Sequence, residues 1–377
     1  MLAAKSSEPT MVNQQVRHGG DLENAITRYG GAVHEWLDLS TGISPWNYPI
    51  PQFESSTWRT LPSPETQLIA AASAYYRCLV CDIAVTPGSQ LAIRLIPQLL
   101  NTALGKKMHA VAIPLIGYQE HANSWQLANH KVIRYRNFDE LDTLVSDNLV
   151  SDVVVINPNN PSAERLSAAG LEKISSMLSG LLIVDEAFSD LEVDYNQHSS
   201  LKPLHHNDNV IVLKSIGKFF GLAGARVGFA VGTHPIVHQL QTLLSPWSVA
   251  GPSMEVATLA LNDRQWQRSQ IKRIKLHAEQ QRIAMAVIKQ NEPNCRIMDQ
   301  SLFFSVFGEN DRIVGLHEHL ARMKIWARLG DPYVDPFVDH SQQLNWLRLS
   351  LAGDQLDRLS AALILFYKTH PNLTTQL

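Results

Sequence analysis

The segment Leu181-Leu-Ile-Val-Asp185-Glu186-Ala-Phe188 decides the fold, because it joins a strongly apolar run directly to two carboxylates. An apolar run without polar alternation is typical of a strand that is covered by helices on both faces. A carboxylate at the end of such a strand is costly unless a cation pairs with it, so Asp185 is expected to have a cationic partner. The structural alternative is that Asp185 caps a helix that follows the strand.

Similar apolar runs recur before and after this segment, and mixed stretches with helical character lie between them. The runs are Ile83–Val85, Val111–Ile113, Val153–Ile156, Val210–Leu213 and Val227–Val231, and Gln90–Leu100 and Leu171–Leu178 are examples of the helical stretches. Alternation of strands and helices predicts an α/β fold with a mostly parallel, doubly wound sheet.

The pattern changes after Pro252, where longer helices and isolated strands predict a smaller α+β domain. The expected elements are one or two long helices over 253–290, strands at Leu302–Val306 and Trp346–Leu351, and helices at Arg312–Met323 and Gln355–Tyr367. We therefore expect three parts: an N-terminal arm (1–45), a large domain (46–252) and a small C-terminal domain (253–377). The arm is expected to form part of the small domain and of the substrate pocket.

Composition excludes several classes of protein. The 377 residues are 45% hydrophobic and carry 32 Lys+Arg against 35 Asp+Glu, so the chain is neither disordered nor basic enough to suggest a nucleic-acid partner. No apolar run approaches the roughly 18 residues that a membrane span needs. The first residues lack the apolar core of a secretory signal, which favours the cytoplasm. Cys78 and Cys81 have CxxC spacing, but no second ligand pair follows, so no metal site is expected.

Two turns carry polar groups at strand ends. In Thr86-Pro-Gly-Ser-Gln90, a glycine turn opens an apolar helix, and free N–H groups at a helix N-terminus suit a phosphate. An ordinary strand-to-helix turn is the alternative, and the absence of GxGxxG argues against a nicotinamide enzyme. The second turn, Asn157-Pro-Asn-Asn-Pro161, should present asparagine side chains at the carboxyl edge of the sheet, where ligands of such folds bind.

A lysine in unusual surroundings follows in Ser215-Ile-Gly-Lys218-Phe-Phe-Gly-Leu-Ala-Gly224-Ala-Arg226-Val-Gly228. A partly desolvated lysine loses basicity and can form a Schiff base. A lone lysine is more often a solvated side chain. The fixed order of phosphate turn, Asn-Pro turn, strand-end aspartate and lysine with a trailing arginine favours the functional interpretation of Lys218.

These motifs, in this order, resemble those of the fold-type-I pyridoxal-phosphate enzymes of the class I/II aminotransferase group, from His18 to about Gly353. The resemblance implies the type I transferase fold, in which a large cofactor-binding domain contains a seven-stranded sheet. It also implies pyridoxal 5′-phosphate (PLP) as cofactor and a homodimer with active sites at the subunit interface. By the same resemblance Lys218 bonds to the cofactor, Asp185 pairs with the pyridine nitrogen and Asn160 binds the ring O3′. The remaining assignments are phosphate binding by Ser89, Gln90, Ser215 and Arg226, ring stacking by Tyr118 and carboxylate binding by Arg348.

Departures from the group narrow the expected activity. Phe188 stands where many members have tyrosine, and Arg59-Thr-Leu61-Pro62 replaces the Arg-Tyr-Pro of histidinol-phosphate aminotransferases. The opening His18-Gly-Gly-Asp21 is similar to that of the cobalamin-pathway threonine-phosphate decarboxylases, in which this stretch helps to enclose the substrate phosphate. The similarity implies substrate contacts for His18, Gly19, Gly20 and Arg328. For Arg328, the alternative is a solvated surface position.

The expected reaction is decarboxylation of O-phospho-L-threonine to (R)-1-aminopropan-2-yl phosphate for cobalamin biosynthesis, with Lys218 returning a proton to Cα. Histidinol-phosphate aminotransferase is the rival function, since it shares the fold and a phosphorylated substrate. A non-catalytic regulator on the same fold would carry a DNA-binding domain before it, and only about 17 residues precede His18.

Overall fold

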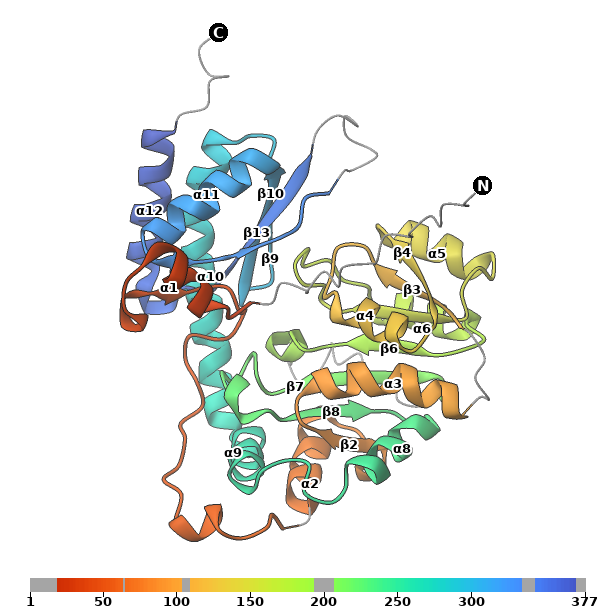
Figure 1. Ribbon diagram of the computed structural model, residues 1–377. Helices are drawn as coiled ribbons and strands as arrows, with labels where there is room; N and C mark the ends of the chain where they lie inside the picture. The colour runs from red at the N-terminus through yellow and green to blue at the C-terminus, as the bar shows by residue number, and fades with distance from the viewer. Residues whose placement is uncertain (1–18, 64, 104–108, 193–206, 334–342, 371–377) are drawn as a thin grey trace, which may run out of the picture.

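A seven-stranded sheet with the order β2-β8-β7-β6-β5-β3-β4 forms the centre of the larger part of the molecule (Figure 1). The computed structural model describes residues 19–63, 65–103, 109–192, 207–333 and 343–370. The strands are β2 (Ile83–Thr86), β3 (Ala110–Pro114), β4 (Lys131–Tyr135), β5 (Asp152–Ile156), β6 (Leu182–Asp185), β7 (Val210–Ser215) and β8 (Gly228–Val231). Only β8 is antiparallel to its neighbours, so the predicted mostly parallel sheet is confirmed.

Helices cover both faces of this sheet because alternate strand residues enter two separate cores. On β7, for example, Val212 packs into one core and Ile211 into the other. The first face is covered by α2 (Thr66–Tyr76), α5 (Phe138–Ser146), α6 (Ala168–Met177) and α9 (Gly251–Asn262). The second is covered by α3 (Ser89–Ala103), α4 (Glu120–Leu127) and α8 (Pro235–Leu244).

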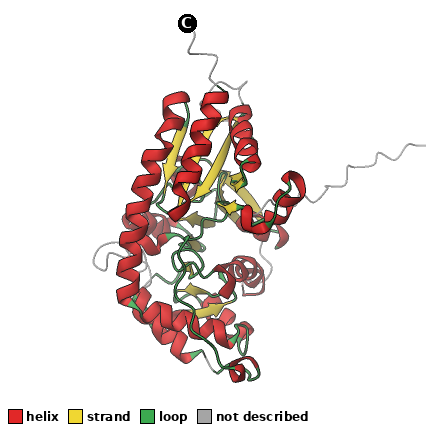
Figure 2. Ribbon diagram, turned by 90° about the vertical axis from the view of Figure 1, so that its left-hand side faces the viewer, coloured by secondary structure: helices red, strands yellow, loops and turns green. Residues whose placement is uncertain are grey.

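A second, antiparallel sheet with the order β12-β13-β10-β9 lies above the first in Figure 1. Its strands are β9 (Arg296–Asp299), β10 (Phe303–Glu309), β12 (Arg328–Leu329) and β13 (Leu344–Ser350). Helices α10 (Arg264–Asn291), α11 (Asn310–Arg322) and α12 (Leu356–Thr369) pack on its outer side, in front of the strands in Figure 2. The α+β character predicted for this part is confirmed. In the part of the chain that is described, no helix has the length and apolarity needed to cross a membrane.

The N-terminal segment belongs in space with the C-terminal elements. It contains α1 (Leu22–Tyr29), which contacts α11, and β1 (Leu37–Asp38), which pairs in parallel with β11 (Ile325–Trp326). The chain then crosses to the large sheet, where the Ser44 N–H donates to the Lys218 carbonyl at 3.0 Å. This crossing brings the segment that follows β1 against the loop that carries Lys218.

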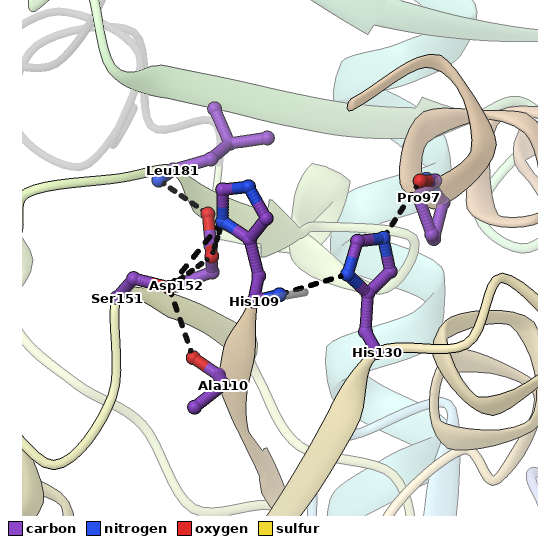
Figure 3. A network of polar contacts seen from close by, with 7 residues as sticks. All are labelled: Pro97, His109, Ala110, His130, Ser151, Asp152 and Leu181. Carbon is purple, nitrogen blue, oxygen red and sulfur yellow. Dashed lines mark hydrogen bonds and ion pairs between the residues drawn. The ribbon is translucent and has the colours of Figure 1, made fainter. Parts of the chain in front are cut away.

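A buried network of hydrogen bonds connects the amino ends of the parallel strands (Figure 3). The Asp152 carboxylate is fully buried and accepts hydrogen bonds from the Leu181 N–H at 2.8 Å and the Ser151 hydroxyl at 2.6 Å. His109 Nδ1 lies 2.7 Å from the same carboxylate, and the His109 N–H donates to His130 Nδ1 at 3.2 Å. The network thus joins β3, β4, β5 and β6 at the edge opposite the one where Asp185 and Ser215 end their strands.

Candidate active site

A cavity of about 190 Å³ lies between the carboxyl ends of the large-sheet strands and the strands β12 and β13. It is lined by Gly19, Thr41, Gly88, Ser89, Gln90, Tyr118, Ile156, Asn160, Asp185, Ala187, Phe188, Ser215, Lys218, Arg226, Arg328 and Arg348. The structure therefore brings together all the site residues predicted from Ser89 to Arg348. Of the predicted N-terminal group, Gly19 lines the cavity, Gly20 does not, and His18 lies outside the described residues.

Lys218 lines this cavity, and its amine is weakly basic there. Burial of the amine, together with repulsion from the Arg348 and Arg328 guanidinium groups, lowers the pKa of Lys218 to about 7. Its Nζ donates a hydrogen bond to the Thr41 carbonyl at 2.9 Å and lies 5.2 Å from the centroid of the Phe188 ring. A large share of the amine is then neutral near pH 7, which is the nucleophilic form.

Asp185 ends β6 in a buried position, and a histidine side chain lies within hydrogen-bond distance of its carboxylate. His121 Nε2, from α4, lies 2.9 Å from Asp185 Oδ2, and both side chains are almost fully buried. The Ala187 N–H donates to Oδ1 at 3.0 Å, so Asp185 also holds the turn that follows the strand. The sequence interpretation missed His121, because its only signal was its place three residues after Tyr118 at the start of a polar helix.

Glycines build an anion cradle at the start of α3. Gly88 has a φ of +74°, and a Cβ on it would lie 2.6 Å from Arg226 Nη2. A Cβ on Gly228 would lie 2.5 Å from the Ser89 backbone nitrogen. Only glycine lets the arginine and the helix N-terminus approach each other this closely. With Ser215 also lining the cavity, these groups suit a phosphate.

The Gln90 side chain has a different partner from the expected phosphate. Its Oε1 accepts a hydrogen bond from the Tyr118 hydroxyl at 2.7 Å, and its Nε2 donates to Glu120 Oε2 at 2.7 Å. Both polar atoms of the amide are therefore hydrogen-bonded to protein side chains, Tyr118 and Glu120. What Gln90 offers an anion in the cradle is its backbone N–H in the first turn of α3.

Two arginines on adjacent strands form the side of the cavity that faces Lys218. Arg328 on β12 is paired in register with Arg348 on β13. Arg348 is 1% exposed, and its guanidinium donates to Asn160 Oδ1 at 2.5 Å and to the Ser40 carbonyl. Burial and the neighbouring Arg328 lower the pKa of Arg348. Arg328 therefore belongs to the cavity wall, and the alternative of a surface position is wrong.

The N-terminal arm reaches this wall through Ser40, a residue that the sequence interpretation did not single out. A Cβ on Gly19 would lie 2.3 Å from the Ser40 carbonyl oxygen and 3.4 Å from Arg348 Nη2. The Gly20 N–H, expected at a substrate phosphate, instead donates to the Ser40 hydroxyl at 2.7 Å. The hydroxyl in turn donates to Asp38 at 2.6 Å.

The donor set fits PLP. A weakly basic amine lies between a carboxylate that is held by an imidazole and a cradle that suits a phosphate. Tyr118 supplies an aromatic wall, and a carboxylate oriented in this way can pair with a ring nitrogen.

Comparisons with known proteins agree with this geometry. The profile of the family described as aminotransferase class I and II matches residues 54–363. The chain is 36% identical to a threonine-phosphate decarboxylase of Pseudomonas aeruginosa over 93% of this chain and 98% of that protein. It is 34% identical to a threonine-phosphate decarboxylase of Sinorhizobium sp. over 89% of this chain and 93% of that protein.

Among solved structures, a histidinol-phosphate aminotransferase from Sinorhizobium meliloti in complex with PLP superposes with a TM-score of 0.75. The match covers 97% of this chain and 99% of that chain, at 20% identity, and shows that the fold is shared. The family profile and the two decarboxylases extend over most of the sequence. The chain therefore belongs to the aminotransferase class I and II family.

Proposed function

We propose that this protein is a PLP-dependent decarboxylase that converts O-phospho-L-threonine to (R)-1-aminopropan-2-yl phosphate. The observation that carries the proposal is the pair of guanidinium groups, Arg328 and Arg348, opposite Lys218 in one cavity. A substrate with a carboxylate and a phosphate needs two separate cationic groups besides those that hold the cofactor. The high coverage of two relatives that bear the name threonine-phosphate decarboxylase supports the same choice.

The charged side chains of the cavity each have a role in this proposal. Lys218 would bond to PLP, Asp185 would pair with the pyridine nitrogen, and Arg226 with the α3 N-terminus would hold the phosphate. When bound, PLP accepts the electron pair that is left at Cα as the carboxylate departs. Arg348 binds the substrate carboxylate and Arg328 the substrate phosphate. The Lys218 amine, held by the Thr41 carbonyl, returns a proton to Cα.

The setting of the reaction is part of the proposal. We assign the activity to cobalamin biosynthesis, as for the decarboxylases that the sequence resembles. A cytoplasmic location is supported by the free cysteines Cys78, Cys81 and Cys295, which suit a reducing compartment.

We also propose a homodimer. A groove of about 760 Å³ is lined by residues from 56–63, 65–68 and α9. Its rim carries Leu61, 68% exposed, and Leu259, 42% exposed, and the neighbouring Trp58 is 67% exposed. Large apolar side chains gathered around one groove are typical of a surface that a partner covers. A second copy of this chain is the proposed partner, because the resemblance to the class I/II aminotransferases implies a homodimer with active sites at the subunit interface.

The activity can be tested by supplying the PLP-loaded protein with O-phospho-L-threonine. We expect release of CO2 and of the amine product without any 2-oxoglutarate. The rival function would instead give 2-oxoglutarate-dependent transamination of histidinol phosphate without CO2. Transamination as the main activity would contradict the decarboxylase assignment while leaving the family membership intact.

Arg328→Ala tests the substrate assignment within the same assay. Loss of a charge-assisted bond should weaken binding of phosphothreonine about tenfold or more and leave unphosphorylated threonine unaffected. The matched control is Arg322→Ala, which removes an exposed arginine on α11. Equal losses for both compounds would assign Arg328 to the carboxylate instead.

A further inference from the structure

A chain of three side chains runs from the cavity lining, where Tyr118 and Gln90 lie, to Glu120, which is not part of the lining. The Tyr118 hydroxyl donates to Gln90 Oε1 at 2.7 Å, and Gln90 Nε2 donates to Glu120 Oε2 at 2.7 Å. Glu120 is the first residue of α4 and is 5% exposed. The exposed Arg94 contacts the same carboxylate oxygen at 3.3 Å, which offsets the cost of burying the charge.

The chemistry of these groups allows only one donor-to-acceptor direction for the two hydrogen bonds of the chain. A carboxylate accepts hydrogen bonds and an amide nitrogen donates them, so Glu120 must receive the NH₂ of Gln90. The amide oxygen of Gln90 is then turned toward Tyr118 and can only accept. Burial and the nearby Glu120 and Asp185 carboxylates raise the pKa of Tyr118 to about 12, so the phenol stays protonated and donates. Reversing the amide would place its oxygen against the carboxylate.

We propose that Glu120 is a positioning residue for the cofactor, which acts through the Gln90 amide to fix the Tyr118 ring against the cavity. The inference rests on the proposed PLP site, where Tyr118 would face the ring. Gln90 also lies in the first turn of α3, beside Ser89 of the anion cradle. The chain therefore connects the phosphate end of the site with its aromatic wall.

A purely structural role for Glu120 predicts a different behaviour. An acidic residue in the first turn of α4 stabilises that helix through its dipole, whatever occupies position 118. The positioning role, in contrast, needs the Tyr118 hydroxyl. Tyr118→Phe should therefore remove any effect of changing Glu120 on the cofactor.

The test titrates apoprotein with PLP and records the dissociation constant and the circular dichroism of the bound chromophore. Glu120→Ala should weaken PLP binding about tenfold and change the dichroism, because the Tyr118 ring loses its fixed angle. Glu120→Gln keeps an oxygen that accepts from Gln90 and should restore both readouts to within about twofold. Glu172→Ala, at an exposed position of α6, is the matched control and should have no effect.

The decisive comparison is made in the Tyr118→Phe background. There, adding Glu120→Ala should leave the PLP dissociation constant unchanged. An equal loss in both backgrounds would overturn the positioning role and leave Glu120 as a helix-stabilising residue. A wild-type protein that takes up no PLP would instead overturn the proposed function, so the two failures are distinguishable.

Discussion

Lys218 owes its low basicity to its surroundings, and this makes its chemistry depend on pH. Because burial and the adjacent arginines lower its pKa to about 7, the amine is protonated and unreactive below that pH and neutral above it. The rate at which apoprotein takes up PLP should therefore rise with pH through about 7 and then level off. Arg348→Met removes one repelling charge and should move the midpoint upward. Absorbance of the bound cofactor measures the uptake rate of the unaltered protein and of the variant. A midpoint at the usual pKa of a solvated lysine would contradict the low pKa of Lys218.

At the same scale, some site residues could be predicted from the sequence and others could not. Lys218 and Asp185 were predictable because each is a charged residue within an apolar or glycine-rich segment, where its presence needs a reason. Arg348 was predicted from the family resemblance alone. His121 and Glu120 lie in a segment rich in polar residues, where any one of them would be interpreted as a solvated side chain. Their importance comes from partners on other elements, Asp185 and Gln90, which no local pattern reveals.

At the scale of elements, the polar network at the amino edge of the large sheet should be a source of stability. Asp152→Asn removes the charge that Leu181, Ser151 and His109 contact in a fully buried position. We expect the free energy of unfolding to fall by about 2 kcal/mol, a typical value for bonds to a buried charged group. Urea unfolding of the apoprotein measures this change. Asp147→Asn, at an exposed helix end, is the control, and a loss no larger than in the control would refute the role of the network.

The strands show why part of the fold was predictable. All the apolar runs that were expected to form the large sheet lie in it, since these strands, the edge strand β2 among them, are buried on both faces. The strand β4 was missed because it begins with the exposed Lys131 and is only partly buried, unlike β2 at the other edge of the sheet. The two-residue strands β1 and β11 were missed as well, because pairs this short are held by the segments around them.

At the scale of the whole molecule, the proposed dimer predicts the effect of a charge on the groove beside α9. Leu61→Asp would place a carboxylate in the interface without a partner, which is costly to bury. We expect sedimentation velocity to show a monomer for this variant and a dimer for the unaltered protein. Leu127→Asp changes an equally apolar side chain, 79% exposed on α4, and should leave the dimer intact. A monomeric unaltered protein would refute the dimer.

The arrangement of the large sheet has a consequence for how such a protein can change over evolutionary time. The polar groups that fasten the parallel strands lie at their amino ends, whereas the cavity residues follow their carboxyl ends. Substitutions in the loops of the cavity therefore do not touch the bonds of Asp152 and its neighbours. Substitutions in these loops can therefore change the substrate specificity while the fold keeps its stability. Specificity and stability thus depend on opposite ends of the same strands.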